Sequence, residues 1–288
     1  MGDQIVQVII YIIVGGFALL TLLPFLYILA GSFATERELT ERAFFIIPHT
    51  WSLNAFKYVM KTGDIFRGLG NTAFVTVLGT FMDMVLTATF AYPLSRRNFK
   101  GRNGVLNMVI VTMLFSGGMI PSYLLISNLK LLNSFASIIL PGMISAFNLI
   151  IVKNFFQQIP TELEEAGRID GASDIGIFTR IILPLSKPVL ASISLFYAVG
   201  HWNDYFNAML YITDPKKEVM QIVLRRIIFL AGGISPTGES IDYGMFGAPP
   251  EKAVKMATTA IAIIPILCVY PFIQKYFTQG LMVGAVKG

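Results

Sequence analysis

The sequence predicts an all-α integral membrane protein with six transmembrane helices, and three observations support this fold class. Of the 288 residues, 55% are hydrophobic and only 14% are charged, whereas about 25% are charged in ordinary soluble domains. The mean hydropathy is +0.67. Long apolar segments recur along the chain, and a helix that spans a bilayer needs about 20 mostly apolar residues. The lipid bilayer is therefore the expected environment and partner of the chain, and we expect it to bind no nucleic acid.

Six segments have the length and apolarity of membrane spans. They are residues 8–31, 70–94, 104–126, 133–156, 188–210 and 256–277. The third and fourth are interrupted by "SGGMIP" and "LPG", and such kinks are tolerated where neighbouring helices satisfy the freed backbone groups. We therefore expect a packed bundle. The single cysteine, Cys268, excludes a disulfide within the chain and a cysteine-based metal site, so no metal is expected.

The first span has an alternative interpretation as a cleaved signal peptide, because "AGS" at 30–32 resembles a cleavage site. However, Asp3 and no Lys or Arg precede the apolar run, which is also longer than a usual signal-peptide core. We interpret it as a retained transmembrane helix.

The loop "SRRNFKGRN" between the second and third spans holds four basic residues and no acid, so it should be cytoplasmic. With six spans, both termini and the loop at 157–187 are then cytoplasmic as well. The loops at 32–69 and 211–255 fall outside; they hold eleven Lys and Arg and nine acids, but the rule is weak for long loops.

The outer loop at 211–255 contains "EVMQIVLRRIIFLA" (218–231), which predicts a helix on the outer membrane surface because it is too short and too charged for a span. A Gly/Pro-rich stretch follows it. Long linkers, low-complexity tracts and evident repeats are missing from the sequence, so residues 1–288 are expected to form one membrane domain.

The polar loop at 157–187 predicts a helical hairpin, although a solvated loop with helical propensity is the alternative. Thr161 and Glu164 have the spacing of a capping box, so a helix should run from about Thr161 to Ile169. Asp170–Gly171 should end it, because glycine tolerates the left-handed conformation. Ser173 can cap a second helix, which Pro184 and Pro188 punctuate before the fifth span.

The hairpin resembles the cytoplasmic coupling motif of ABC importer permeases: E-A-A, three residues, G, nine residues, I-x-L-P. The match departs at Gly167, where the family has a second Ala, and Gly costs about 1 kcal/mol relative to Ala inside a helix. The resemblance implies docking on an ATPase subunit. The residues concerned are Glu165, Ala166, Gly167, Asp170, Gly171, Ile181, Leu183 and Pro184.

The resemblance extends over nearly the whole chain. The ending "YPFIQKYFTQGLMVGAVKG" and "HWNDYF" at 201–206 look like maltose-type carbohydrate permeases, especially the subgroup for complex oligosaccharides. This implies a MetI-like type I importer fold, with a five-helix core and a peripheral N-terminal helix. It also implies that the tail, with Gly280, Lys287 and Gly288, reaches between two ATPase subunits.

The resemblance implies a bacterial inner or plasma membrane location and several protein partners. They are a second, related permease in a heterodimer, two ATP-binding subunits and an external solute-binding protein. The sequence has no G-x-x-x-x-G-K-[ST] phosphate loop, so the chain should not be an enzyme. It should bind no cofactor itself, with ATP and Mg bound by the ATPase subunits.

Charged and polar residues within spans mark a candidate substrate path, since such residues are costly in a bilayer. Asp83 could line the path or pair with a neighbouring helix. Trp202, Asn203, Asp204 and Asn207 are residue types that bind sugars, although an aromatic belt also explains the tryptophan. On a continuous helix, we expect Asn203 and Asn207 to face the cavity and Trp202 to flank it.

Other classes of function explain the sequence less well. In an ion-coupled secondary transporter, Asp83 and Asp204 could be ion sites, but such a carrier needs no helical ATPase dock. A scaffold or receptor leaves the intramembrane acids unexplained. The sequence lacks H-E-x-x-H and G-x-S-x-G motifs, so a membrane hydrolase is disfavoured.

Overall fold

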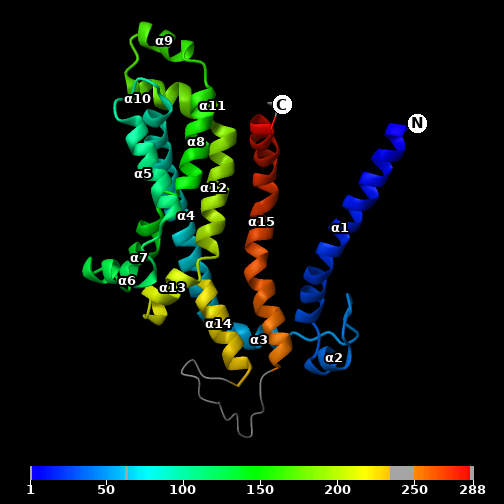
Figure 1. Ribbon diagram of the computed structural model, residues 1–288. Helices are drawn as coiled ribbons and strands as arrows, with labels where there is room; N and C mark the ends of the chain where they lie inside the picture. The colour runs from blue at the N-terminus through cyan, green and yellow to red at the C-terminus, as the bar shows by residue number, and fades with distance from the viewer. Residues whose placement is uncertain (1, 62–63, 234–249, 286–288) are drawn as a thin grey trace. The chain divides into compact units, whose positions relative to one another are not determined.

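The computed structural model describes residues 2–61, 64–233 and 250–285, with side chains of the last helix described to Cys268. Helices dominate these residues, and one isolated antiparallel bridge pairs Ala34 with Trp51. The elements in chain order (Figure 1) are α1 (Gly2–Ser32), α2 (Glu36–Glu41), α3 (Asn54–Lys61), α4 (Asp64–Ser95), α5 (Arg102–Leu114), α6 (Met119–Asn128), α7 (Ala136–Ile139), η1 (Leu140–Gly142), α8 (Ala146–Gln158), α9 (Glu162–Ile169), α10 (Asp174–Ile177), η2 (Phe178–Ile182), α11 (Leu183–Leu185), α12 (Lys187–Trp202), α13 (Phe206–Tyr211), η3 (Pro215–Lys217), α14 (Met220–Ala231) and α15 (Glu251–Ala285).

Two of the described helices are long and apolar enough to cross a membrane, α1 over Gln4–Ser32 and α4. They contain the predicted first and second spans. Three bent pairs of helices pass the same test together: α5 with α6 at 114°, α7–η1 with α8 at 50°, and Asp174–Leu185 with α12 at 82°. The predicted sixth span lies in α15, whose side chains are described only in part, so the count of six spans stays a prediction.

The bends have local causes. Between α5 and α6, Gly118 has a φ of +85°, which no helix accommodates, so "SGGMIP" produces a sharp corner instead of the expected kink. Before α8, the Ser145 side chain accepts from the Asn148 backbone N–H and caps a new helix start. The third bend falls at Ser186, directly before α12, and Pro188 lies in the first turn of this helix, where proline is tolerated.

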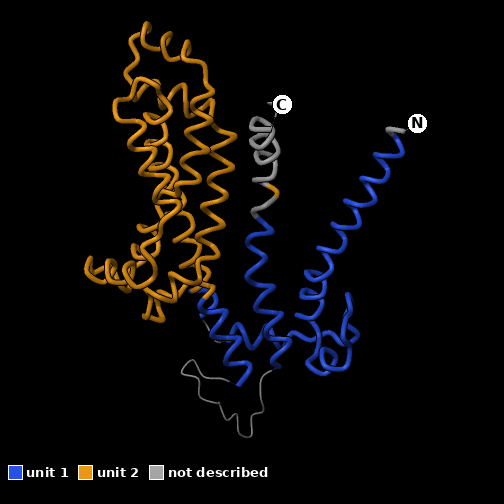
Figure 2. The backbone as a smooth tube through the Cα atoms, in the orientation of Figure 1, with its two compact units in different colours: residues 1–67, 222–268 blue, residues 68–221, 269–288 orange. Residues whose placement is uncertain are grey.

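The described chain falls into two compact units, residues 1–67 with 222–268 (unit 1) and residues 68–221 with 269–288 (unit 2) (Figure 2). The expectation of one domain over 1–288 stays a prediction. In unit 2, α4, α5, α8 and α12 lie alongside one another, with α9 at one end and α6, α7 and α13 at the other (Figure 1). Their shared core contains Leu94, Leu149, Phe156, Ile177 and Ile193, all at most 1% exposed.

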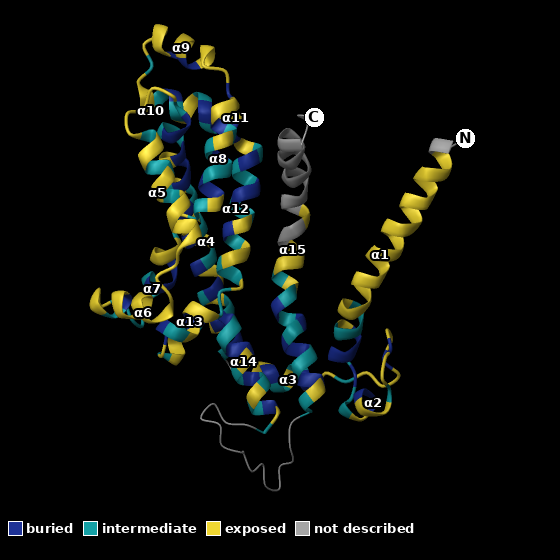
Figure 3. Cartoon of the chain, viewed as in Figure 1, coloured by how far each residue is buried: buried dark blue, intermediate teal, exposed yellow. Residues whose placement is uncertain are grey.

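The unit 1 helix α1 is exposed along most of its length (Figure 3), as an apolar helix in contact with lipid would be. By contrast, α14 buries an apolar stripe that includes Met220, Val223 and Ile227. The sequence correctly predicted a helix here. Its placement on the outer membrane surface stays a prediction. The Gly/Pro-rich stretch at 234–249 lies outside the described residues.

A buried carboxylate organises the long loop after α1, which the sequence analysis left without structure. Glu38 is 6% exposed and accepts hydrogen bonds from the backbone N–H groups of His49 and Thr50 at 2.8 and 3.1 Å. Arg42 also donates to it at 2.6 Å. The bond from the His49 N–H is the main reason that the pKa of Glu38 is lowered to about 2, with Thr50 and Arg42 adding to it.

This pKa shift predicts a pH window for stability. A carboxyl group with a depressed pKa stabilises the fold fully above its ordinary value of 4.5 and loses that contribution as the pH falls towards about 2. We therefore expect Glu38→Gln to lower the unfolding temperature equally at pH 7 and pH 6. The difference from wild type should shrink below about pH 4.5. Thermal unfolding in detergent measures it, with Glu41→Gln as an exposed control; a pH-independent difference would contradict the assignment.

Candidate functional site

The hairpin predicted at 157–187 forms, and its turn has the predicted cause. Helix α9 ends at Ile169, and Gly171 follows with a φ of +81°. The N–H of Gly171 donates to the Arg168 carbonyl at 3.0 Å, and the N–H of Ala172 donates to the Gly167 carbonyl at 2.9 Å. These two bonds make a Schellman motif, which satisfies the last carbonyls of α9. The turn is therefore rigid and requires glycine.

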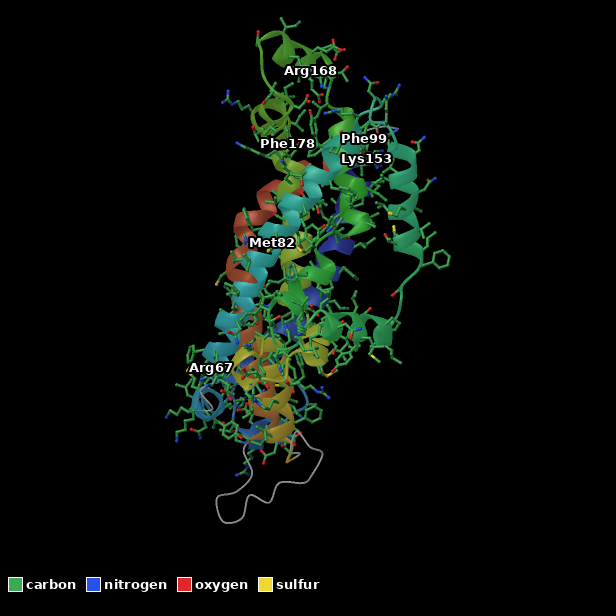
Figure 4. All side chains as sticks on the ribbon, turned by 90° about the vertical axis from the view of Figure 1, so that its left-hand side faces the viewer. Arg67, Met82, Phe99, Lys153, Arg168 and Phe178 are labelled. Atoms are coloured by element: carbon green, nitrogen blue, oxygen red, sulfur yellow. The ribbon has the colours of Figure 1, made fainter. Side chains whose placement is uncertain are left out.

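The second arm begins as predicted, with the Ser173 side chain accepting from the Gly176 N–H at 3.2 Å. It continues through α10, the π-helical turn η2 and α11 to the bend at Ser186. Phe178 in η2 packs on Tyr92 of α4 and Phe156 of α8, with ring centroids 5.1 and 6.5 Å apart. The labelled side chains of Figure 4 show Arg168 at the outer end of the hairpin and Phe178 deeper. The second arm of the hairpin is thus packed against α4 and α8.

The predicted capping box is wrong. The Thr161 side chain makes no capping hydrogen bond, and its backbone is already helical. Glu164 is 4% exposed and forms an ion pair with Arg96, from the basic loop after α4. A carboxylate held by the partly buried guanidinium of Arg96 cannot turn back to cap its own helix.

Arg96 makes several contacts that join the basic loop to the hairpin. Besides the Glu164 ion pair, its Nη1 donates to the Phe156 carbonyl at 3.0 Å, and its guanidinium lies 5.1 Å from the Tyr92 ring centroid. The sequence analysis used Arg96 only as a topology signal. The basic loop and the acidic residues of the hairpin suggested that an ion pair could form, but no feature of the neighbouring sequence identified Glu164 as the partner of Arg96.

Gly167 has a packing reason that the sequence analysis missed. A Cβ atom at this position would lie 2.9 Å from Cδ1 of Ile181 and 3.3 Å from Cγ1 of Ile177. Gly167 therefore lets the two arms of the hairpin approach closely, and its helix-propensity cost is offset by this contact. Two positions of the coupling motif, 167 and 181, thus meet in space.

The remaining motif residues divide by exposure. Glu165, Ala166, Asp170 and Gly171 are exposed, and so is Pro184 on the second arm. Ile181 and Leu183 are partly buried against the core of unit 2. Arg168 and Asp174 form an exposed ion pair of 3.2 Å between the arms. The outer face of the hairpin therefore presents acidic and small side chains to solvent.

Unit 2 also contains a cavity of about 690 Å³, near the end of α12 that lies away from the hairpin. Its lining includes Asp83, Tyr197, His201, Asp204 and Asn207. Three of the five substrate-path candidates from the sequence thus face one cavity. Across the described residues, no group of three or more His, Cys, Asp and Glu side chains is arranged to hold a metal ion.

Asp83 both lines this cavity and pairs with a neighbouring helix, so the two readings of the sequence are compatible. Its Oδ2 atom lies 2.7 Å from Nε2 of His201 on α12. The imidazole fills the space above Gly79, one turn earlier on α4, where a Cβ would lie 2.6 Å from Nε2. Met82, the residue before Asp83, marks the middle of α4 in Figure 4. His201 was not among the substrate-path residues predicted from the sequence.

The assumption of a continuous helix through Asn203 is wrong, and the place of Asn203 in the substrate path stays a prediction. Helix α12 ends at Trp202, and the Asn203 amide turns back to donate to the Val199 carbonyl at 3.0 Å. Asn203 and Trp202 are not among the residues that line the cavity. Asp204 is, and it accepts from the backbone N–H and the side-chain amide of Asn207 at 3.2 and 3.1 Å. The broken helix explains the difference, since the prediction assumed a continuous one.

The C-terminal candidates are described only in part. Gly280 lies within helix α15, and Lys287 and Gly288 lie outside the described residues. The predicted role of the tail stays a prediction.

Comparison with known proteins determines the class. Residues 1–283 match the family described as "binding-protein-dependent transport system inner membrane component". The chain belongs to this family. It is a permease component of an ABC transport system in the inner membrane, and not an enzyme. The predicted all-α permease fold of the MetI-like type is confirmed.

Several relatives of this permease are similar along their full length. Protein LplC of Bacillus subtilis (strain 168) is 54% identical over 274 residues, which is 95% of this chain and 92% of that protein. The polygalacturonan/rhamnogalacturonan transport system permease protein YtcP of the same strain is 48% identical over 288 residues, all of both chains. A chain in the crystal structure of a bacterial ABC transporter involved in alginate import is 31% identical, with a TM-score of 0.85 over 96% of this chain and 98% of that one.

The Arg96–Glu164 pair predicts a specific pattern of stability. The side chains are 17% and 5% exposed, and removal of one partner of a buried ion pair costs about 3 kcal/mol because the other charge stays behind. We expect Arg96→Met and Glu164→Gln each to lower the unfolding temperature of the purified permease. The double variant should be more stable than the sum of the single effects predicts.

Arg97→Met is the matched control, because Arg97 is exposed beside Arg96. Additive effects of the two changes in a double-mutant cycle would argue against a direct pair.

The contact at Gly167 predicts a size limit. Gly167→Ala should be nearly neutral, because Cδ1 of Ile181 is the end of a flexible side chain and alanine gains about 1 kcal/mol of helix propensity. Gly167→Val should lower the unfolding temperature by pushing the arms apart, and Ile181→Ala in the same chain should restore part of the loss. If valine were tolerated without the second change, the close approach would not matter in solution.

Proposed function

We propose that this permease forms, with a second permease, the translocation path of an ATP-driven importer of carbohydrate in the form of oligosaccharides. The names of its relatives support the substrate class. YtcP is named for polygalacturonan and rhamnogalacturonan transport, AraQ of Bacillus subtilis, 27% identical over 276 residues, for arabinooligosaccharides, and the alginate importer carries an acidic polysaccharide.

The observation that carries the mechanism is the continuity of the hairpin with α12. The exposed face around Glu165, Ala166 and Asp170 is accessible to a partner protein, whereas the second arm of the hairpin packs on α4 and α8. The chain then passes through Ser186 directly into α12, which lines the cavity. An ATPase that moves the hairpin would therefore move a wall of the cavity.

The assembly that we propose has two permeases in a heterodimer, two ATPase subunits and an external solute-binding protein. The family description supports the binding protein, and the missing phosphate loop supports separate ATPase chains. ATP and Mg would be bound there and not by this chain. The tail from Gly280 to Gly288 would reach the ATPase interface.

We further propose that both termini are cytoplasmic. Contacts within unit 2 support this orientation, because loops predicted on the same side touch each other. Arg96 of the basic loop contacts Glu164 of the hairpin. At the other end, Asn133, the first residue of the predicted fourth span, accepts from the backbone N–H groups of Thr213 and Asp214 at 2.6 and 3.0 Å, which joins the start of that span to the loop at 211–255 predicted to be outside.

A retention experiment tests the coupling role. Glu165→Lys should reverse a charge on the docking face, and Gly171→Pro should break the turn, because proline requires a φ near −65° where Gly171 has +81°. We expect each to reduce both recovery of the ATPase with the gently solubilised permease and sugar uptake by more than about tenfold, which needs a loss of only about 1.4 kcal/mol.

Glu162→Lys is the control, since Glu162 is exposed on the same helix but outside the motif. Membrane levels of all variants are measured alongside. Normal uptake by both motif variants would refute the coupling role, and an absence of any bound ATPase in the wild type would refute the assembly.

A further inference from the structure

We propose that the cavity wall supplied by this permease favours glycosyl units without a carboxylate over uronate units. This inference rests on the proposed function and names a substrate class for the same path. Two relatives are named for the transport of acidic polymers, so this proposal predicts a different preference from the one that their names would suggest.

The charged groups of the cavity carry the first step. Asp83 and Asp204 line it, and no Lys or Arg is among its lining residues. Among the lining residues, His201 is the only base, and its Nε2 atom already pairs with Asp83 at 2.7 Å. A sugar carboxylate entering this side would meet like charge without a local cation, and like charges repel.

Asp204 keeps its negative charge available to the cavity. Its oxygens accept from the backbone N–H and the side-chain amide of Asn207, both neutral donors. Among the described residues it forms no ion pair. Neutral donors orient the carboxylate but do not cancel its field.

The hydrogen-bonding groups carry the second step. Asp83 is fully buried, and its Oδ1 atom has no hydrogen-bond partner among the described residues. A buried acceptor without a donor is unfavourable, and a sugar hydroxyl can supply that donor, whereas the additional carboxylate of a uronate unit brings no further donor. Ser116, Ser122 and Asn148 add further hydroxyl and amide groups to the lining. The cavity of about 690 Å³ is within the range of about 300–1,000 Å³ that is usual for small-ligand sites.

A labelling experiment on the intact purified importer tests the charge of the wall directly. Cys268→Ser removes the native thiol, and Ser122→Cys places a reporter on the exposed cavity side of α6. The reporter thiolate reacts with trimethylammonium-ethyl, sulfonato-ethyl and hydroxyethyl methanethiosulfonates, each of which forms a mixed disulfide with it and releases methanesulfinate. We expect the ratio of cationic to anionic rates to exceed the ratio for glutathione. Asp204→Asn should lower it about fivefold at low salt, the value for charges roughly 8 Å apart in water.

Glu162→Gln, which removes an exposed acid from the hairpin, should leave the ratio unchanged, and the neutral reagent should react equally in all variants if the fold is intact. A wild-type ratio at or below that of glutathione, or one insensitive to Asp204→Asn, would overturn the proposal.

A matched pair of sugars tests the substrate class in the same preparation. Fully methyl-esterified oligogalacturonide should slow labelling of the reporter more than the free acid of equal length. Equal protection, or stronger protection by the acid, would overturn the proposal. Failure of the proposed function would be recognised separately, as ATP hydrolysis that no oligosaccharide-loaded binding protein stimulates.

Discussion

The packing of unit 2 depends on the hydroxyl group of Tyr197. It shares a 2.7 Å hydrogen bond with Thr87 of α4 and accepts from the backbone N–H of Ser145 at the start of α8, at 3.0 Å. One buried side chain of α12 thereby fixes two other helices in an apolar bundle, where a hydroxyl without partners is costly. On one side of it lies the shared core that reaches the hairpin, and on the other lies the cavity.

The sequence predicted best those features that a few neighbouring residues determine. Gly171 and Ser173 act on backbone groups within three or four positions, so the turn and the second arm could be predicted from residue type alone. The capping box has the same short range, yet it failed because Glu164 is drawn to Arg96, 68 positions earlier in the chain. A short-range rule holds only where no distant partner competes for the side chain.

The cavity shows the same limit. Asp83 and Asp204 were identifiable because charge within an apolar span is costly. The partner of Asp83 was not, since His201 is 118 positions away and its place depends on the space left by Gly79. The expectation for Asn203 assumed a helix that continues beyond Trp202, where the backbone instead turns to begin α13. The apolar pattern predicted the length of the segment but not the position of this break.

The second hairpin arm and α12 are two helical segments that meet at Ser186 at an angle of 82°. If the angle between them is kept, a force that rotates the second hairpin arm about Ser186 rotates α12 by the same angle. The 16 residues of α12 extend about 24 Å, so a rotation of about 5° displaces the far end by about 2 Å. That end carries His201, which is clamped to α4 and borders the cavity. A small angular movement of the hairpin is therefore enough to strain or release the contact between two walls of the path.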